Sequence, residues 1–143
     1  MRTENPKGPQ GGMEARTEVK KGYLKVILEG EFSIPDAMKI ASRVFDFCHQ
    51  HKIRNVLLDA RKVTGKPSLV TKIEFADTMV EKQMEYIVKG SPRLRIAHLL
   101  DPGMAEPVKF GEMLAAKRGA IIFVTHTLDE ALRWLGVEEG TTR

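Results

Sequence analysis

The sequence predicts an α/β domain in which helices cover a mostly parallel five-stranded sheet. Short apolar runs that suit buried strands alternate with longer segments whose apolar residues recur every three or four positions, as in helices packed on a sheet. The central run, residues 55–59, ends at Asp59 and is followed by a polar connection containing Gly65 and Pro67. This pattern is typical of an interior strand of a parallel sheet that delivers a loop at its carboxyl end. Two further runs near the amino terminus predict an antiparallel hairpin at the sheet edge.

The strands are predicted from their apolar content and from the turn residues that bound them. The first two form the hairpin and are joined at Lys20-Lys21-Gly22, where the glycine suits a turn. The other three are joined by right-handed crossovers and run parallel. The five predicted strands are residues 16–19, 23–28, 56–59, 94–100 and 120–124.

About four helices are predicted to cover the sheet. Ser33 is followed by Pro35 and Asp36, and a cap residue, a first-turn proline and an early carboxylate together indicate a helix start. Thr127 and Glu130 form a capping box for the last helix. The predicted helices are residues 34–52, 69–88, 107–119 and 128–135.

The length of 143 residues predicts one domain. Residues 1–14 are rich in proline and glycine and poor in apolar side chains, so we expect a flexible N-terminal tail. Residues 15–137 form the predicted domain, and residues 138–143 a short C-terminal tail. No apolar run suits a signal peptide or a membrane span, so we expect a cytoplasmic protein.

The charge pattern argues against nucleic acid as a partner. The net charge is +4, and both signs are interspersed along the chain, which is typical of a solvated surface. Six Phe, two Tyr and one Trp are too few, and too regularly spaced, for a base-stacking platform. No glycine-rich phosphate loop follows a strand, so no cofactor is expected. Cys48, His49 and His51 do not converge on one helix face, so no metal site is expected either.

Three polar residues are candidates for a crevice at one end of the sheet. Asp59, Asp101 and His126 each lie at or just beyond the carboxyl end of a predicted strand, where open α/β sheets place ligands. A histidine beside carboxylates can perform general acid–base catalysis. In the alternative interpretation, the aspartates bond their own loop backbone and His126 shapes the entrance of the last helix.

The second helix has an unusually wide apolar face that includes Phe75, Met79 and Tyr86. Three explanations are open: these residues belong to the core, to a homodimer surface, or to the wall of a pocket for an apolar small molecule. Trp134 lies beside the apolar stripe of the last helix and is a candidate interface anchor or packing residue. His98 lies inside an apolar strand, which predicts a core or interface residue.

Four segments, in this order and spacing, resemble a known family: LEGEF at residues 28–32, VLLD at 56–59, IAHLL at 96–100 and TLDEALRWL at 127–135. The stretch from residue 23 to 136 is similar to the STAS superfamily of bacterial regulatory domains, especially its small SpoIIAA-like branch, which borders on CRAL-TRIO-like lipid-carrier folds.

The resemblance implies a domain without catalysis that docks to a protein partner. In the regulatory members, a serine at the start of the helix after the central strand is phosphorylated to release that partner. Ser68 occupies the matching position, where Lys62, Lys66 and Lys72 would favour a phosphate, although Lys66-Pro67-Ser68-Leu69-Val70 replaces the usual Asp-Ser-Ser-Gly. In the alternative interpretation, Ser68 simply caps the helix.

The leading functional hypothesis is therefore a STAS-like regulatory or protein-interaction module, homodimeric and without cofactor. A carrier or sensor of a small apolar or lipid-like ligand is the first alternative, and an enzyme using the crevice is the second.

Overall fold

The computed structural model describes residues 12–65, 68–101 and 121–139. Its five strands form one sheet in the order β1-β2-β3-β4-β5. β1 is antiparallel to β2, and each of the other neighbouring pairs is parallel. The predicted α/β class, with a mostly parallel five-stranded sheet and an antiparallel hairpin at its edge, is confirmed.

The hairpin consists of β1 (Glu14–Lys20) and β2 (Tyr23–Glu31). Lys20 pairs with Tyr23, so the turn has only two residues, Lys21 and Gly22. Gly22 has φ +88°, which glycine adopts without steric cost. Both strands extend beyond the predicted ranges, because β1 and β2 pair as far as Glu14 and Glu29 and the last residues of β2 pair with β3.

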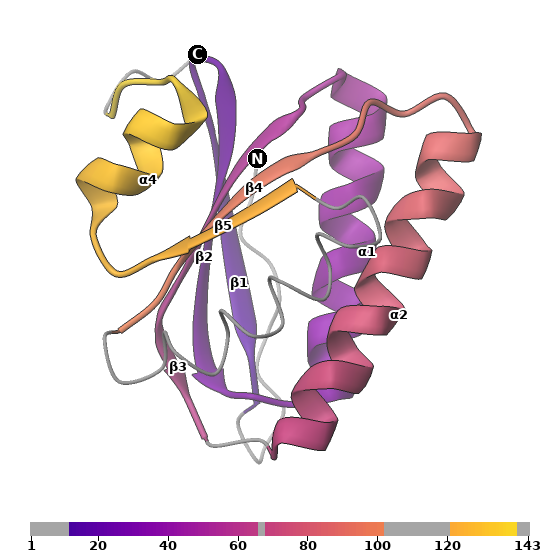
Figure 1. Ribbon diagram of the computed structural model, residues 1–143, viewed down its shortest axis with the longest axis vertical. Coiled ribbons are helices and arrows are strands. Elements are labelled where there is room, and N and C mark those ends of the chain that lie inside the picture. The colour runs from indigo at the N-terminus through magenta and orange to yellow at the C-terminus, as the bar shows by residue number, and fades with distance from the viewer. Residues whose placement is uncertain (1–11, 66–67, 102–120, 140–143) are drawn as a thin grey trace.

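Helices lie on both faces of the sheet (Figure 1). α1 (Ile34–His51) and α2 (Leu69–Val88) cover one face, and α4 (Leu128–Leu135) covers the other. The caps predicted at Ser33 and Thr127 are present, since each side chain accepts a hydrogen bond from the backbone N–H three residues later. The described residues contain three helices, and the predicted helix at residues 107–119 lies outside them. No helix in the described part of the chain is long and apolar enough to span a membrane.

The central strand β3 (Asn55–Thr64) is longer than predicted. The predicted end at Asp59 is wrong, because β2 continues beside β3 and pairs Glu29, Gly30 and Glu31 with Lys62, Val63 and Thr64. On the other side β3 pairs with β4 (Arg95–Leu99), which pairs in turn with β5 (Ile121–Thr125), and both of these strands are shorter. Asp59 therefore lies inside a strand, not in the loop that follows it.

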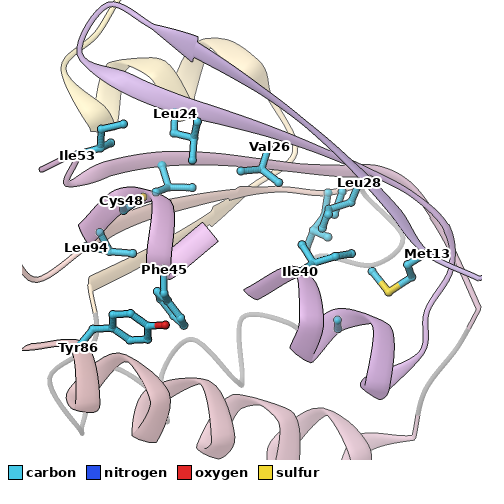
Figure 2. Close-up of a cluster of buried hydrophobic side chains, with 14 of the residues drawn as sticks. Met13, Leu24, Val26, Leu28, Ile40, Phe45, Cys48, Ile53, Tyr86 and Leu94 are labelled. Carbon is cyan, nitrogen blue, oxygen red and sulfur yellow. The ribbon is translucent and has the colours of Figure 1, made fainter. Parts of the chain in front are cut away.

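Two apolar clusters hold the layers together. The larger lies between the sheet and the helices α1 and α2, and Figure 2 shows Leu24 and Val26 of the sheet above Phe45 and Tyr86 of the helices. The smaller lies between the sheet and α4 and contains Tyr23, Leu57, Ala97, Leu99, Ala131, Leu132 and Leu135. Each additional buried apolar side chain contributes about 1.5–3 kcal/mol relative to exposure, so both faces contribute to stability.

Gly12 to Glu14 belong to the folded domain, although their composition placed them in the N-terminal tail. Met13 is only 6% exposed, its N–H donates to Asp36 Oδ2 at 3.1 Å, and its Sδ accepts from the N–H of Ser33 at 3.4 Å. Its side chain thus fills the end of the larger cluster beside the start of α1 (Figure 2).

Candidate functional site

Ser68 is exposed at the start of α2, immediately after the connection from β3. Its Oγ accepts a hydrogen bond from the N–H of Thr71 at 3.1 Å and donates to Thr71 Oγ1 at 3.0 Å. Ser68 therefore caps the helix. The same position would also suit a phosphate, because the positive end of the helix dipole and its unbonded N–H groups lie there. Its role as a switch stays a prediction.

The chain before Ser68 carries cations, and the helix after it carries apolar side chains. Lys62 is exposed on β3, whereas Lys66 and the side chain of Lys72 lie outside what the structure describes. Val70, two residues after Ser68, is 64% exposed. Phe75, further along α2, packs edge-to-face on Phe32 with ring centroids 5.6 Å apart. Because Phe32 directly precedes the cap of α1, this contact fixes the start of α2 against the start of α1.

Asp59 is bound by Arg61, two residues along the same strand. Arg61 Nε donates to Asp59 Oδ1 at 2.9 Å, Arg61 Nη2 donates to Oδ2 at 2.8 Å, and the backbone N–H of Arg61 donates to Oδ1 at 3.2 Å. Burial alone would raise the pKa of Asp59, but the hydrogen bonds and the charge of Arg61 outweigh it and lower that pKa. Both carboxylate oxygens are thus occupied, which is unsuitable for a general base.

Removing Arg61 is expected to destabilise the domain. Asp59 is 8% exposed, so the Arg61→Met variant leaves a carboxylate with little water and without its partner. We expect a loss of about 2 kcal/mol at pH 7, less than for a fully buried pair because the arginine side chain is 44% exposed. In the double variant Asp59→Leu/Arg61→Met, most of the loss should be recovered. Urea denaturation of the three proteins measures this, and an unchanged midpoint for Arg61→Met would contradict it.

Asp101 and His126, the other two crevice candidates, are both exposed. The chain segments that carry them are neighbours, since the N–H of Leu100 donates to the carbonyl oxygen of Thr125 at 2.9 Å. The hydrogen bond that Arg61 donates to Asp59 is the main cause that raises the pKa of Arg61, and the charge of Asp101 raises it further. Asp101 is therefore near enough for its charge to act on Arg61.

His126 lies between two threonines that organise the start of α4. Thr125 is buried, its Oγ1 accepts from the N–H of Thr127 at 3.3 Å, and its hydroxyl donates to the carboxylate of Glu130. The capping box predicted for Thr127 and Glu130 is therefore completed through Thr125. The sequence feature that could have indicated this arrangement is a threonine two residues before the cap residue. Within the described ranges, no three or more His, Cys, Asp or Glu side chains are grouped as metal ligands.

The apolar candidates contact the protein interior. Phe75 and Met79 pack against the larger cluster, and Tyr86 is 9% exposed and donates its hydroxyl hydrogen to Asp46. That hydrogen bond, followed by burial, raises the pKa of Tyr86 to about 12. Among the described side chains of α2, the large apolar ones that are exposed are instead Val70, Met84 and Val88.

Trp134 is half-buried on α4 and stacks on Phe123 of β5, with ring centroids 5.4 Å apart. The guanidinium of Arg95 lies 4.5 Å from the Trp134 ring centroid. Arg95 Nη2 also donates to the backbone oxygen of Trp134 at 2.8 Å. A cation that binds the last carbonyls of a helix stabilises the helix end. Because Arg95 belongs to β4, its contacts with Trp134 also attach α4 to the sheet.

No family model matches the sequence, and no curated protein matches it. Among the solved structures that match, one is the crystal structure of an anti-sigma factor antagonist from Mycobacterium paratuberculosis, with a TM-score of 0.58 and 14% sequence identity. The match covers 92% of this chain and 99% of that chain. The chain therefore has the fold of an anti-sigma factor antagonist, the STAS fold that the sequence resemblance predicts.

Proposed function

We propose that this chain is a STAS-like regulatory module that docks to a protein partner through the surface at the start of α2. The observation that carries the proposal is the exposed Ser68 at the N-cap of α2, in a fold shared with an anti-sigma factor antagonist. A phosphate on Ser68 would change the charge of the docking surface and release the partner.

The proposed docking surface comprises Ser68 and Val70 at the start of α2. It combines a hydroxyl that can be modified with an apolar side chain that is 64% exposed. An apolar contact that is rimmed by polar groups is typical of protein–protein interfaces. The contact of Phe75 with Phe32 holds the start of α2 in place, so the surface is presented on a rigid element.

A role without catalysis is supported by the crevice residues. Both oxygens of Asp59 are bonded to Arg61, and the exposed His126 belongs to the entrance of α4. The carrier alternative has no specific support among the described residues, because Phe75, Met79 and Tyr86 contact the larger cluster.

A charge on Ser68 is expected to release the partner. The test compares Ser68→Asp with Ser68→Asn, because both side chains cap a helix well and only the first adds a negative charge. A photo-crosslinking amino acid in place of Val70, in the full chain expressed in its native cells, should form an adduct with a partner protein. The Ser68→Asp background should reduce the yield at least about tenfold, equivalent to about 1.4 kcal/mol of binding energy. The Ser68→Asn background should preserve it.

The matched control places the same crosslinker at Val88, at the other end of α2, where the side chain is 84% exposed. The adduct should be absent from this position. Equal adducts at both positions, or equal yields with Ser68→Asp and Ser68→Asn, would refute the docking surface. Phosphopeptide mapping tests the switch separately, since modification found only at other residues would remove Ser68 from the proposal.

A further inference from the structure

Segments that are distant in sequence meet at the end of the sheet that leads into α2. The start of β1 pairs with the end of β2 there. The last residues of β2 and β3, Glu31 and Thr64, pair with each other at the same end. The N–H of Phe32 then donates to the carbonyl oxygen of Thr64 at 2.9 Å. The docking surface at Ser68 and Val70 therefore follows directly from a point where several segments are joined.

Gly12 and Met13, the two residues before β1, lie against this end of β2 and are called the strap below. The approach is close, because a Cβ on Gly30 of β2 would lie 2.0 Å from the carbonyl oxygen of Gly12. A Cβ on Gly12 itself would lie 2.7 Å from Asp36 Oδ2. Both glycines have positive φ, +106° at Gly12 and +108° at Gly30. Since glycine alone adopts such angles without steric cost, both residues suit the close approach of the strap.

Met13 attaches the strap to the start of α1. Its backbone N–H donates to Asp36 Oδ2 at 3.1 Å, and its Sδ accepts from the N–H of Ser33 at 3.4 Å. Its side chain is buried in the larger cluster. Ser33 is the N-cap of α1, and Phe32 directly precedes it. Met13 therefore holds the backbone that carries Phe32.

Phe32 connects the start of α1 to the chain on both sides of Ser68. Its N–H bonds Thr64, which ends the strand before Ser68. Its ring packs edge-to-face on Phe75, in the helix after Ser68, with centroids 5.6 Å apart. The connection that leads to Ser68 and the helix that follows it are thus both attached to one residue, whose position depends on Met13.

From this chain of contacts we infer that the strap controls the docking surface. Met13, acting through Ser33 and Phe32, holds the start of α2 in the conformation that presents Ser68 and Val70. Release of the strap loosens the start of α2 while the sheet and α4 stay folded. A contiguous series of packed side chains and hydrogen bonds can carry such coupling. The inference rests on the proposed function only in taking Ser68 and Val70 as the docking surface.

Hydrogen exchange tests the coupling without a partner. Met13→Ala removes most of a buried side chain and the sulfur, so the amides of residues 71–75 should exchange at least about tenfold faster. Met13→Leu fills similar space and keeps the N–H that bonds Asp36, so these rates should stay within about threefold of the original. Leu135→Ala is the matched control, because Leu135 is equally buried in the smaller cluster on the other face of the sheet. It should leave the exchange of residues 71–75 unchanged.

Two further variants test the path. Asp36→Ala leaves the larger cluster intact and removes the acceptor of the Met13 N–H, so it decides the question if Met13→Ala does not fold. It should accelerate exchange at residues 71–75 about threefold. In the double variant Met13→Ala/Phe32→Leu, the acceleration should be at least about threefold smaller than the product of the two single effects, because both act through Phe32.

Equal acceleration at residues 71–75 in Met13→Ala and Leu135→Ala would overturn the inference. So would unchanged exchange in Asp36→Ala, or a double variant whose effect equals the product. With the photo-crosslinker at Val70, Met13→Ala should lower the adduct yield about threefold relative to Leu135→Ala, and equal yields would show that the strap does not control docking. Absence of an adduct from the otherwise unaltered protein would refute the docking surface alone, since the exchange measurements involve no partner.

Discussion

Replacing Gly30 with alanine is expected to destabilise the domain by about 3 kcal/mol or more. Gly30 has φ +108°, a conformation that L side chains rarely adopt. A Cβ at this position would lie 2.0 Å from the carbonyl oxygen of Gly12 and 3.2 Å from the Cα of Met13. These are backbone atoms, so no rotation of a side chain relieves the contact. The substitution must displace the chain before β1, and with it the buried Met13.

Gly90→Ala is the matched control. Gly90 has φ +97°, and a Cβ there would meet no atom within 4 Å. This variant carries similar backbone strain without the collision, so we expect a loss of about 1–2 kcal/mol. The difference between the two losses in free energy of unfolding, from urea denaturation, therefore measures the cost of the collision between a Cβ at position 30 and the backbone of Gly12. Equal losses would show that this collision costs nothing.

Lowering the pH from 7 to 4 is expected to cost up to about 3 kcal/mol of stability through His98 alone. His98 lies on β4 between Leu58 of β3 and Val124 of β5, and burial lowers its pKa to about 4. The unfolded chain has the ordinary histidine pKa of about 6.5, so below that pH the unfolded state binds a proton that the folded state excludes. The contribution is fully present above about pH 6.5 and is lost as the pH falls toward 4. The value is an upper bound because the residue is only half-buried.

The His98→Leu variant isolates this effect. Carboxylates also titrate near pH 4, but they do so equally in both proteins. The difference in unfolding free energy between the two proteins should therefore change by up to about 3 kcal/mol between pH 7 and pH 4. His126→Gln is the matched control for removing a histidine, because His126 is exposed. Parallel pH profiles for the unaltered protein and His98→Leu would contradict the prediction.

Local signals predicted the elements that depend on local contacts. Ser33 and Thr127 accept hydrogen bonds from N–H groups three residues away, so each helix start is encoded in a few neighbouring residues. The hairpin turn at Lys21-Gly22 is equally local. The length of β3 does not depend on local contacts. Residues 62–64 at its polar end lack the sequence pattern of a strand, and they form one because they pair with Glu29 to Glu31 of β2. The same extension moved Asp59 from the predicted loop into the sheet.

The candidate sites divide in the same way. The sequence located Ser68 at a helix start, and the structure places it there as an exposed cap. It did not predict that Arg61 occupies both oxygens of Asp59, although an acid and a base two residues apart share one face of a strand and could have indicated the pair. Thr125 was missed for a different reason, since its partner Glu130 lies across the turn into α4.

By itself, the sequence determined the α/β class, the order of the described elements, the caps of the helices and the resemblance to the STAS fold. All of these depend on periodicity and on hydrogen bonds between residues close in the chain. The tertiary structure decided how far β3 extends, which partner Asp59 has, why position 30 is a glycine and how deeply His98 is buried. Each of these depends on segments that are distant in sequence and meet only when the sheet has formed.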